Sequence, residues 1–309
     1  MDVIEVAGLR KSYRRLRGGS RVALDGLDLA IPAGGVFGFL GPNGAGKTTT
    51  IRCLLGLVAP TAGSCRLLGA DVPGQLHQVT GRVGSIVETP ALFPTMTGRR
   101  NLALLGRLHG IGPRRVPEVL ERVGLAERAD DLVKRYSLGM RQRLGLAAAL
   151  LKDPEVLILD EPANGLDPAG IKAVRDLLRS LGAEGRTVFV SSHLLSEIRQ
   201  TCDRVAILAH GRCVAAGPVA EVLANGDGAG LLVRLDDLAA GRAVLLGAGI
   251  PAAPDGDALR VALPPGQAAA ITRTLASQGL YVTELRPDEA DLEAVFLELT
   301  AERPPEVTG

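Results

Sequence analysis

The sequence lacks an excess of charge of either sign. Its 35 Lys and Arg residues and 34 Asp and Glu residues leave a net charge of +1. The basic residues are dispersed, and their densest cluster, which runs from Arg10 to Arg17, is more typical of a solvated turn than of a phosphate-binding face. The sequence therefore predicts no broad basic face, and nothing in it indicates a nucleic-acid partner.

Cysteine is also scarce and is not arranged as a metal-binding motif. The cysteines form no C-x-x-C pair, and no nearby histidine completes a zinc-ligand spacing. The sequence therefore predicts reduced, small apolar residues in a cytosolic protein. The four residues are Cys53, Cys65, Cys202 and Cys213.

Long apolar runs are absent as well. No uninterrupted run approaches the roughly 20 residues that a membrane-spanning helix needs. The first residues, Met1–Glu5, lack the basic and apolar regions of a signal peptide. We expect a soluble, cytoplasmic chain without a span of its own. Such a chain would lie on the inner face of the cell membrane only through a partner.

One stretch that is present carries clear chemistry. Gly41–Thr48 has the spacing G-x-x-x-x-G-K-[ST] of a phosphate-binding loop. The apolar run Val36–Leu40 before it predicts a buried strand. Apolar residues at helical spacing predict a helix that begins at the loop, and they are Ile51, Leu54, Leu55 and Val58. The alternative, a glycine-rich turn that matches by chance, is expected about one time in a hundred.

A strand, loop and helix in this order bind polyphosphates for physical reasons. Glycines let the backbone turn tightly, so that its N–H groups face an anion. The N-terminus of the helix adds its positive dipole. Lys47 is expected to reach the terminal phosphates of a nucleotide, and the Thr48 hydroxyl is expected to bind Mg²⁺.

Short apolar strands alternate with helical patterns, which predicts the α/β class with a parallel sheet. At the N-terminus, alternating segments around Val3–Val6 and Val22–Leu29 predict an antiparallel β subdomain. The strands expected in the parallel sheet after the phosphate loop are Val83–Val87, Val156–Asp160, Thr187–Ser191 and Arg204–Leu208.

A helical insertion interrupts these strands. Three helical patterns lie between Gly98 and Leu151, and Ser137 is expected to be the N-cap of the third. We place this helical subdomain at about residues 90–151. The residues that define the first helix are Leu102, Leu105, Leu108 and Ile111.

A second domain follows the linker Asn225–Gly228. We assign residues 1–224 to a nucleotide-binding domain and residues 229–303 to a C-terminal accessory domain. The accessory domain has the pattern β-α-β-β-α-β of a small α+β, ferredoxin-like module, with Asp255-Gly256 as a hairpin turn. A last helix is expected to place Leu292, Val295, Phe296 and Leu299 on one face.

Two acidic residues end the strand Val156–Asp160. At the carboxyl edge of a parallel sheet such residues face the ligand crevice. We expect Asp160 to hold Mg²⁺ through water and Glu161 to polarise an attacking water. The alternative is that both acids only end a strand, and the phosphate loop upstream favours the catalytic role.

Further motifs follow a fixed order. Ser137 and Gly139 at a helix start form a second anion-binding N-terminus, far from the phosphate loop in sequence. Both could grip one nucleotide if two copies of the chain met head to tail. After the acids come Asn164–Asp167 and then His193, just beyond a strand.

With these motifs the chain resembles the ATP-binding subunits of ABC transporters over about residues 1–217. The resemblance implies a P-loop ABC ATPase core, ATP and Mg²⁺ as ligands, a Tyr13 that stacks on adenine, and a switch residue at His193. The alternative for Tyr13 is a tyrosine at a strand edge without a ligand, and the alternative for His193 is an ordinary loop histidine. The nucleotide-binding residues that it implies are Tyr13, Gly41, Asn43, Gly44, Gly46, Lys47, Thr48, Thr49, Ser137 and Gly139.

The same resemblance assigns catalysis and the metal. It implies that Glu161, His193 and Glu88 are catalytic, and that Thr48, Asp160 and Glu88 bind Mg²⁺. Glu88 stands where the family has a glutamine. A carboxylate can bind Mg²⁺ or orient water there, but it adds negative charge beside the γ-phosphate, which affects turnover more than binding.

Other departures from the family are smaller. Leu138 and Met140 replace a glycine and the glutamine of the signature motif, while its serine and second glycine remain, so phosphate contact should survive. Ala163 replaces a hydroxyl residue, with little expected effect. The stretch around Glu88 and the C-terminal module resemble bacitracin-, lantibiotic- and multidrug-type exporter ATPases.

We therefore expect an ATP-hydrolysing exporter subunit that forms a homodimer and needs a separate membrane permease. The resemblance implies efflux of a drug, antibiotic or peptide. The alternative is a soluble ABC-type ATPase with a regulatory or resistance role and no permease. Members that act on ribosomes usually carry two ATPase units in one chain, whereas this chain has one.

Overall fold

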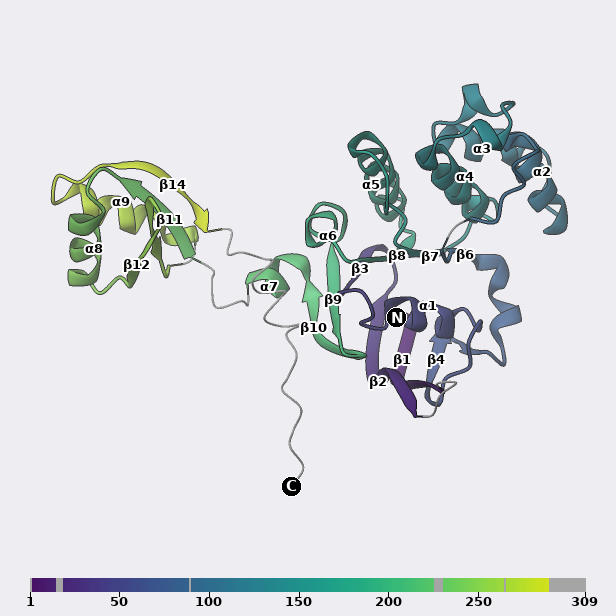
Figure 1. The fold of residues 1–309 in the computed structure, drawn as a ribbon, viewed down its shortest axis with the longest axis horizontal. Helices are drawn as coiled ribbons and strands as arrows, with labels where there is room; N and C mark the ends of the chain where they lie inside the picture. Colours follow the sequence, from purple (N-terminus) through teal and green to yellow (C-terminus); the bar gives the residue numbers. More distant parts are fainter. Residues whose placement is uncertain (1, 15–18, 89, 225–229, 264, 289–309) are drawn as a thin grey trace. The chain divides into compact units, whose positions relative to one another are not determined.

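The structure is a computed structural model that describes residues 2–14, 19–88, 90–224, 230–263 and 265–288. It divides into two compact units, Met1–Val219 and Ala220–Gly309 (Figure 1). The linker Asn225–Gly228 and the last predicted helix lie outside the described residues. Each unit is described by itself below.

A six-stranded sheet in the order β10-β9-β3-β8-β7-β6 forms the centre of the first unit. Neighbouring strands from β9 to β6 are parallel, and β10 is antiparallel to β9. The α/β class and the parallel sheet are thus confirmed. The strands are β3 (Gly35–Leu40), β6 (Val83–Ile86), β7 (Val156–Asp160), β8 (Thr187–Ser192), β9 (Arg204–Ala209) and β10 (Arg212–Pro218).

The register of this sheet decides which chain segments meet. Leu40 of β3 pairs with Ser192 of β8, and Asp160 of β7 pairs with Ser191. These strands therefore end at the same edge. The loops that leave this edge contain the predicted phosphate loop, the acid pair and His193.

A second, antiparallel sheet has the order β2-β1-β4-β5, and it confirms the predicted antiparallel subdomain. Its strands are β1 (Asp2–Arg14), β2 (Ser20–Pro32), β4 (Ala62–Leu67) and β5 (Ala70–Val72). Helix α1 (Lys47–Leu54) shares one core cluster with both sheets. The core cluster includes Ile4, Leu24, Ile51, Ile158 and Phe189. Both elements that flank the predicted phosphate loop, β3 and α1, are therefore fixed in this core.

The helical insertion contains three α-helices, as predicted. They are α2 (Gly98–Leu108), α3 (Arg115–Arg122) and α4 (Leu138–Leu150). The Ser137 hydroxyl accepts a hydrogen bond from the Met140 N–H at 3.2 Å, which confirms Ser137 as the N-cap of α4. Ile111, predicted on the first helix, lies beyond the end of α2. Short 3₁₀ turns are η1 (Leu76–Gln78), η2 (Thr80–Arg82), η3 (Ala126–Arg128) and η4 (Val133–Arg135).

The remaining helices of the first part of the chain follow the strands β7, β8 and β10. They are α5 (Pro168–Ala183), α6 (Leu195–Thr201) and α7 (Val219–Ala224). Asp167 caps α5 by accepting a hydrogen bond from the Gly170 N–H at 2.9 Å. The strand β10 was not expected from sequence, where Gly211–Gly230 is dominated by glycine and alanine.

The second unit has the element order β-α-β-β-α-β. Its sheet has the order β12-β13-β11-β14, and all three strand pairs are antiparallel. A hairpin joins β12 to β13 as expected, but its two turn residues are Gly256 and Asp257, one position later than the predicted Asp255-Gly256, because Asp255 pairs with Ala258. The elements are β11 (Gly230–Leu235), α8 (Leu238–Gly247), β12 (Ala252–Asp255), β13 (Ala258–Val261), η5 (Pro265–Gln267), α9 (Ala268–Ala276) and β14 (Val282–Asp288).

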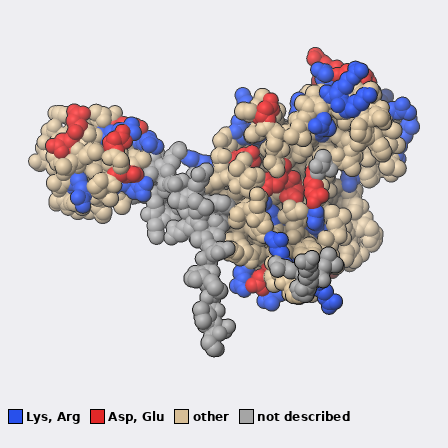
Figure 2. Space-filling view, viewed as in Figure 1, with Lys and Arg blue, Asp and Glu red and all other residues tan. Residues whose placement is uncertain are grey.

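Charged side chains of both signs lie on the surface, and the cysteines form no disulfide. Figure 2 shows that most of the face in view is uncharged and that basic side chains gather over the helical insertion at the upper right. All four cysteines are free thiols, and three of them are buried. Burial raises the pKa of the Cys65 thiol to about 12. It also raises the pKa of the Cys202 thiol, so neither thiol is activated for reaction at neutral pH.

The aromatic contacts of Phe189 allow a stability prediction. Its ring is fully buried and lies 5.2 Å from the Phe39 ring, centroid to centroid. Phe189→Ala should lower the free energy of unfolding by about 3–5 kcal/mol in urea titrations, because it leaves a cavity between the layers. Phe93→Ala, at a side chain 50% exposed, is the control and should change it by less than about 0.5 kcal/mol. Equal effects would contradict this core.

Candidate functional site

The phosphate loop leaves β3 and turns directly into α1. Gly44 and Gly46 have φ angles of 84° and 113°, in the left-handed region that favours glycine. A Cβ on Gly46 would lie 2.7 Å from the carbonyl oxygen of Ala23, so no other side chain fits there. Helix α1 begins at Lys47, and its first N–H groups are therefore available to an anion.

Lys47 is buried in this loop, with a side chain only 6% exposed. Its ammonium donates a hydrogen bond to the Gly41 carbonyl oxygen at 2.5 Å and lies 3.3 Å from Glu161 Oε1. A buried cation must be paired, and Glu161 supplies the opposite charge. Lys47 is thus held at the mouth of the loop, beside the acid expected to activate water.

Asp160 is held by hydroxyl groups from two other segments. Thr48 Oγ1 donates to Asp160 Oδ2 at 2.7 Å, and Ser191 Oγ donates to Asp160 Oδ1 at 2.5 Å. The Glu161 N–H donates in turn to Ser191 Oγ at 3.0 Å. Hydroxyl and carboxylate oxygens suit Mg²⁺, which takes few protein ligands and keeps several waters. The pair Thr48 and Asp160 therefore fits such an ion.

Glu161 lies between a cation and an imidazole. Its Oε2 is 2.8 Å from His193 Nδ1, and its side chain is 21% exposed. The φ of Glu161 is 48°, an uncommon value for a residue with a side chain. Such backbone geometry is frequent at functional sites, because the surrounding structure must enforce it. A carboxylate in this position can accept a proton from water.

Lys47, Thr48, Glu161 and His193 line one cavity of about 410 Å³, a volume in the range of small-molecule sites. It contains most of the residues expected to bind a nucleotide, with Tyr13 among them. The lining residues are Tyr13, Arg21, Ala23, Pro42, Asn43, Gly44, Gly46, Lys47, Thr48, Thr49, Glu161, Asn164 and His193. Gly41 and Asp160 lie directly behind this lining, in contact with Lys47 and Thr48.

Three residues expected in the site lie elsewhere in the described chain. Ser137 and Gly139, at the start of α4, do not line the cavity. The start of α4 instead lies close to the loop that contains Gly165, where an added Cβ would be 3.1 Å from a methyl of Leu138. Glu88 also does not line it, and its carboxylate, 65% exposed, pairs with the guanidinium of Arg52 on α1.

Two residues of the site were not expected from sequence. Ser191 is fully buried and orients both acids, yet it lies in an apolar strand with no motif. Arg21 lines the cavity from β2. In the sequence Arg21 stands only a few residues after Tyr13, in the next strand. That position places it in the site only once the pairing of β1 with β2 is known.

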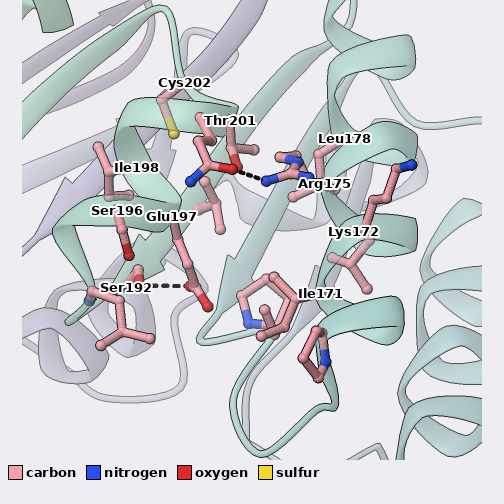
Figure 3. A pocket seen from close by; sticks show the side chains of 17 residues that line it. Ile171, Lys172, Arg175, Leu178, Ser192, Ser196, Glu197, Ile198, Thr201 and Cys202 are labelled. Carbon is pink, nitrogen blue, oxygen red and sulfur yellow. Dashed lines mark hydrogen bonds between the residues drawn. The ribbon is translucent and has the colours of Figure 1, made fainter.

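A second cavity, of about 360 Å³, lies between α5 and α6 (Figure 3). Its lining is largely apolar, which does not suit a polyphosphate. At its edge the Ser192 hydroxyl donates to the Glu197 carboxylate at 2.9 Å. The bond joins the end of β8 to α6 and thereby supports the loop that carries His193.

Comparison with known proteins places the chain in a family. A model of the ABC transporter family matches residues 24–164. The chain is 47% identical over 212 residues to the bacitracin transport ATP-binding protein BcrA of Bacillus licheniformis, and the match covers 68% of each chain. It is 40% identical over 308 residues to the daunorubicin resistance ATP-binding protein DrrA3 of Streptomyces coeruleorubidus, with 97% of this chain and 96% of that protein covered.

The fold of the chain is also similar to that of a solved structure. An ATP-binding subunit of an ABC transporter superposes with a TM-score of 0.62 at 29% identity, over 71% of this chain and 91% of that one. Within the part of the chain that the structure describes, no helix combines the length and the apolar character needed to cross a bilayer.

The role of Ser191 can be tested directly. Ser191→Ala leaves one Asp160 oxygen without its buried donor, so it should lower the free energy of unfolding by about 1–3 kcal/mol in urea titrations. It should also raise the Mg²⁺ concentration needed for half-maximal ATP hydrolysis. Ser85→Ala, at an exposed position of β6, is the matched control. An unchanged Mg²⁺ requirement in Ser191→Ala would show that Ser191 does not orient the acid.

Proposed function

The chain belongs to the ABC transporter ATP-binding proteins, and we propose that it powers an exporter through a separate membrane permease. Members of this family hydrolyse ATP to drive transport. The observation that carries the proposal is the cluster of Lys47, Asp160, Glu161 and His193 around one cavity at the end of a parallel sheet.

We assign the nucleotide as follows. Tyr13 stacks on adenine, and the phosphate loop with Thr49 surrounds the phosphates. Lys47 neutralises the terminal phosphates, and His193 contacts the γ-phosphate. Mg²⁺, held by Thr48 and by Asp160 through water, would offset negative charge on the phosphate oxygens. All of these except Asp160 line the cavity or border it, and Asp160 lies behind Thr48.

Glu161 is assigned as the residue that polarises water. In the described structure its two carboxylate oxygens face Lys47 and His193. A bound terminal phosphate would draw Lys47 toward itself, because the phosphate carries more negative charge than one carboxylate. Glu161 would then be free to orient a water, with His193 fixing the position of its carboxylate.

We propose that the complete site needs two copies of the chain, arranged head to tail. Ser137 and Gly139 would then bind the phosphates held by the partner copy. Support comes from their position at the N-terminus of a 13-residue helix, outside the cavity of their own copy. An N-terminus of this kind attracts anions.

Glu88 is assigned to the linkage between nucleotide and permease. To bind Mg²⁺ or orient water it must leave Arg52, with which it pairs in the described structure. The exchange is easy, because an ion pair this exposed contributes at most about 1 kcal/mol. Movement of Glu88 from Arg52 to the metal would therefore link metal binding to the helical subdomain at residues 90–151.

The partner and cargo are proposed from relatives. The match to DrrA3 includes nearly the whole of both chains, and BcrA acts in bacitracin transport. We propose export of a drug, antibiotic or peptide by a homodimer of this chain on the cytoplasmic face of a permease. The domains would be residues 1–224 for ATP and residues 229–303 for a ferredoxin-like accessory module, supported by its element order.

Replacing the proposed catalytic acid tests the mechanism. Glu161→Gln removes the proton acceptor, so ATP hydrolysis should fall by about 10²- to 10⁴-fold while ATP still binds. The variant should then accumulate as an ATP-bound dimer, measured by size-exclusion chromatography with light scattering. Glu155→Gln, at the opposite end of β7, is the control and should hydrolyse ATP normally. A monomeric Glu161→Gln with bound ATP would contradict the two-copy site.

The permease can be tested by co-purification. A reading frame encoding about six apolar spans should neighbour this gene, and its tagged product should retain the chain in detergent. Basal ATP hydrolysis should change when the two are mixed in lipid vesicles. Failure of every such membrane protein to bind the chain would instead favour a soluble ATPase.

A further inference from the structure

Arg21 occupies an unusual place in the nucleotide cavity. It lies on β2, directly opposite Tyr13 in the pairing of β1 with β2. Its guanidinium reaches the phosphate loop, where a Cβ added to Gly44 would lie 3.3 Å from one of its terminal nitrogens. Arg21 therefore spans the distance between the residue expected to stack on adenine and the loop expected to hold the phosphates.

The charge of Arg21 is not neutralised by any described side chain. The cavity is lined by two cationic residues, Arg21 and Lys47. Lys47 has Glu161 as its partner, whereas the guanidinium of Arg21 makes no hydrogen bond or ion pair with a described residue. Arg10 and Arg212, two other arginines beside β2, both pair with Asp25. Arg21 is thus an exposed cation that faces a cavity and pairs with no acidic side chain among the described residues.

We propose that Arg21 binds the phosphate chain of the nucleotide between the base and the terminal phosphate. The inference rests on the proposed function. A nucleotide that extends from Tyr13 to Lys47 must pass Arg21 and Gly44, and the anionic groups on that path are the α- and β-phosphates. A planar guanidinium can donate two hydrogen bonds to one phosphate, which gives it both charge and geometric fit.

The position of this contact has a kinetic consequence. The α- and β-phosphates are present in ATP, in ADP and throughout hydrolysis of the terminal bond. Arg21 therefore stabilises substrate, transition state and product by similar amounts. An interaction of this kind lowers KM and leaves kcat nearly unchanged. Lys47, placed at the terminal phosphates, should instead affect kcat.

The test compares Arg21→Ala with Arg14→Ala in the full chain. Arg14 is an exposed arginine of β1 that does not line the cavity. Affinity for ATP and for ADP is measured by titration calorimetry, and kcat and KM are measured by phosphate release. For Arg21→Ala we expect both affinities to fall by the same factor, about 5- to 30-fold, with kcat within twofold of the native value.

Further variants guard against a purely structural effect. Arg21→Lys keeps the charge but loses the planar pair of donors, so it should recover part of the affinity. The loss in Arg21→Ala should shrink at high salt, since screening already weakens the native contact. Thermal unfolding without nucleotide should match that of Arg14→Ala, because the Arg21 guanidinium makes no hydrogen bond or ion pair with a described residue.

The outcomes separate this inference from the proposed function. Unchanged affinity in Arg21→Ala, or a loss no larger than that in Arg14→Ala, overturns the inference alone. A fall in kcat with unchanged ADP affinity also overturns it, because that result places Arg21 at the γ-phosphate. Failure of the native chain to bind ATP and ADP overturns the proposed function and this inference together.

Discussion

Buried charge at the end of the parallel sheet is the constraint on which the site depends. Lys47 and Asp160 are almost fully buried, and Glu161 is mostly so. Unpaired, each would cost several kcal/mol in desolvation, so each must have a partner. The partners come from the loop and helix that follow β3, from the end of β7, and from β8 and the residue after it, and the network therefore joins three strands at one edge.

This arrangement leaves the cavity ready for a polyphosphate. The loop glycines expose backbone N–H groups, α1 adds its dipole, and Lys47 already occupies the loop. The ion pair with Lys47 keeps the Glu161 carboxylate in place in the described structure. When a nucleotide binds, its terminal phosphate would replace Glu161 as the partner of Lys47. The apolar cavity between α5 and α6 lies beside the loop that carries His193. The hydrogen bond from Ser192 to Glu197 attaches α6 to the end of β8.

Local patterns predicted those parts of the fold in which neighbouring residues decide the structure. The segments Val36–Leu40 and Val156–Leu159 carry no polar side chain, as expected for strands that are buried on both faces of a sheet. The Ser137 cap is also a local effect. The strand β10 escaped prediction because its alanines and glycine give no alternation, and its pairing with β9 is what makes it a strand. Ile111 kept the helical spacing, but α2 ends before it.

By itself, the sequence determined the chemistry: a loop that accepts phosphates, an acid pair at a strand end, a histidine after the next strand, and the family to which these motifs belong. Only the tertiary structure decided which of these groups meet. It brought Ser191 onto Asp160, set Arg21 opposite Tyr13, and paired Glu88 with Arg52. It left Ser137 and Gly139 outside the cavity. The reason is that strand register and sheet order depend on contacts between distant segments, whereas a motif depends on spacing along the chain.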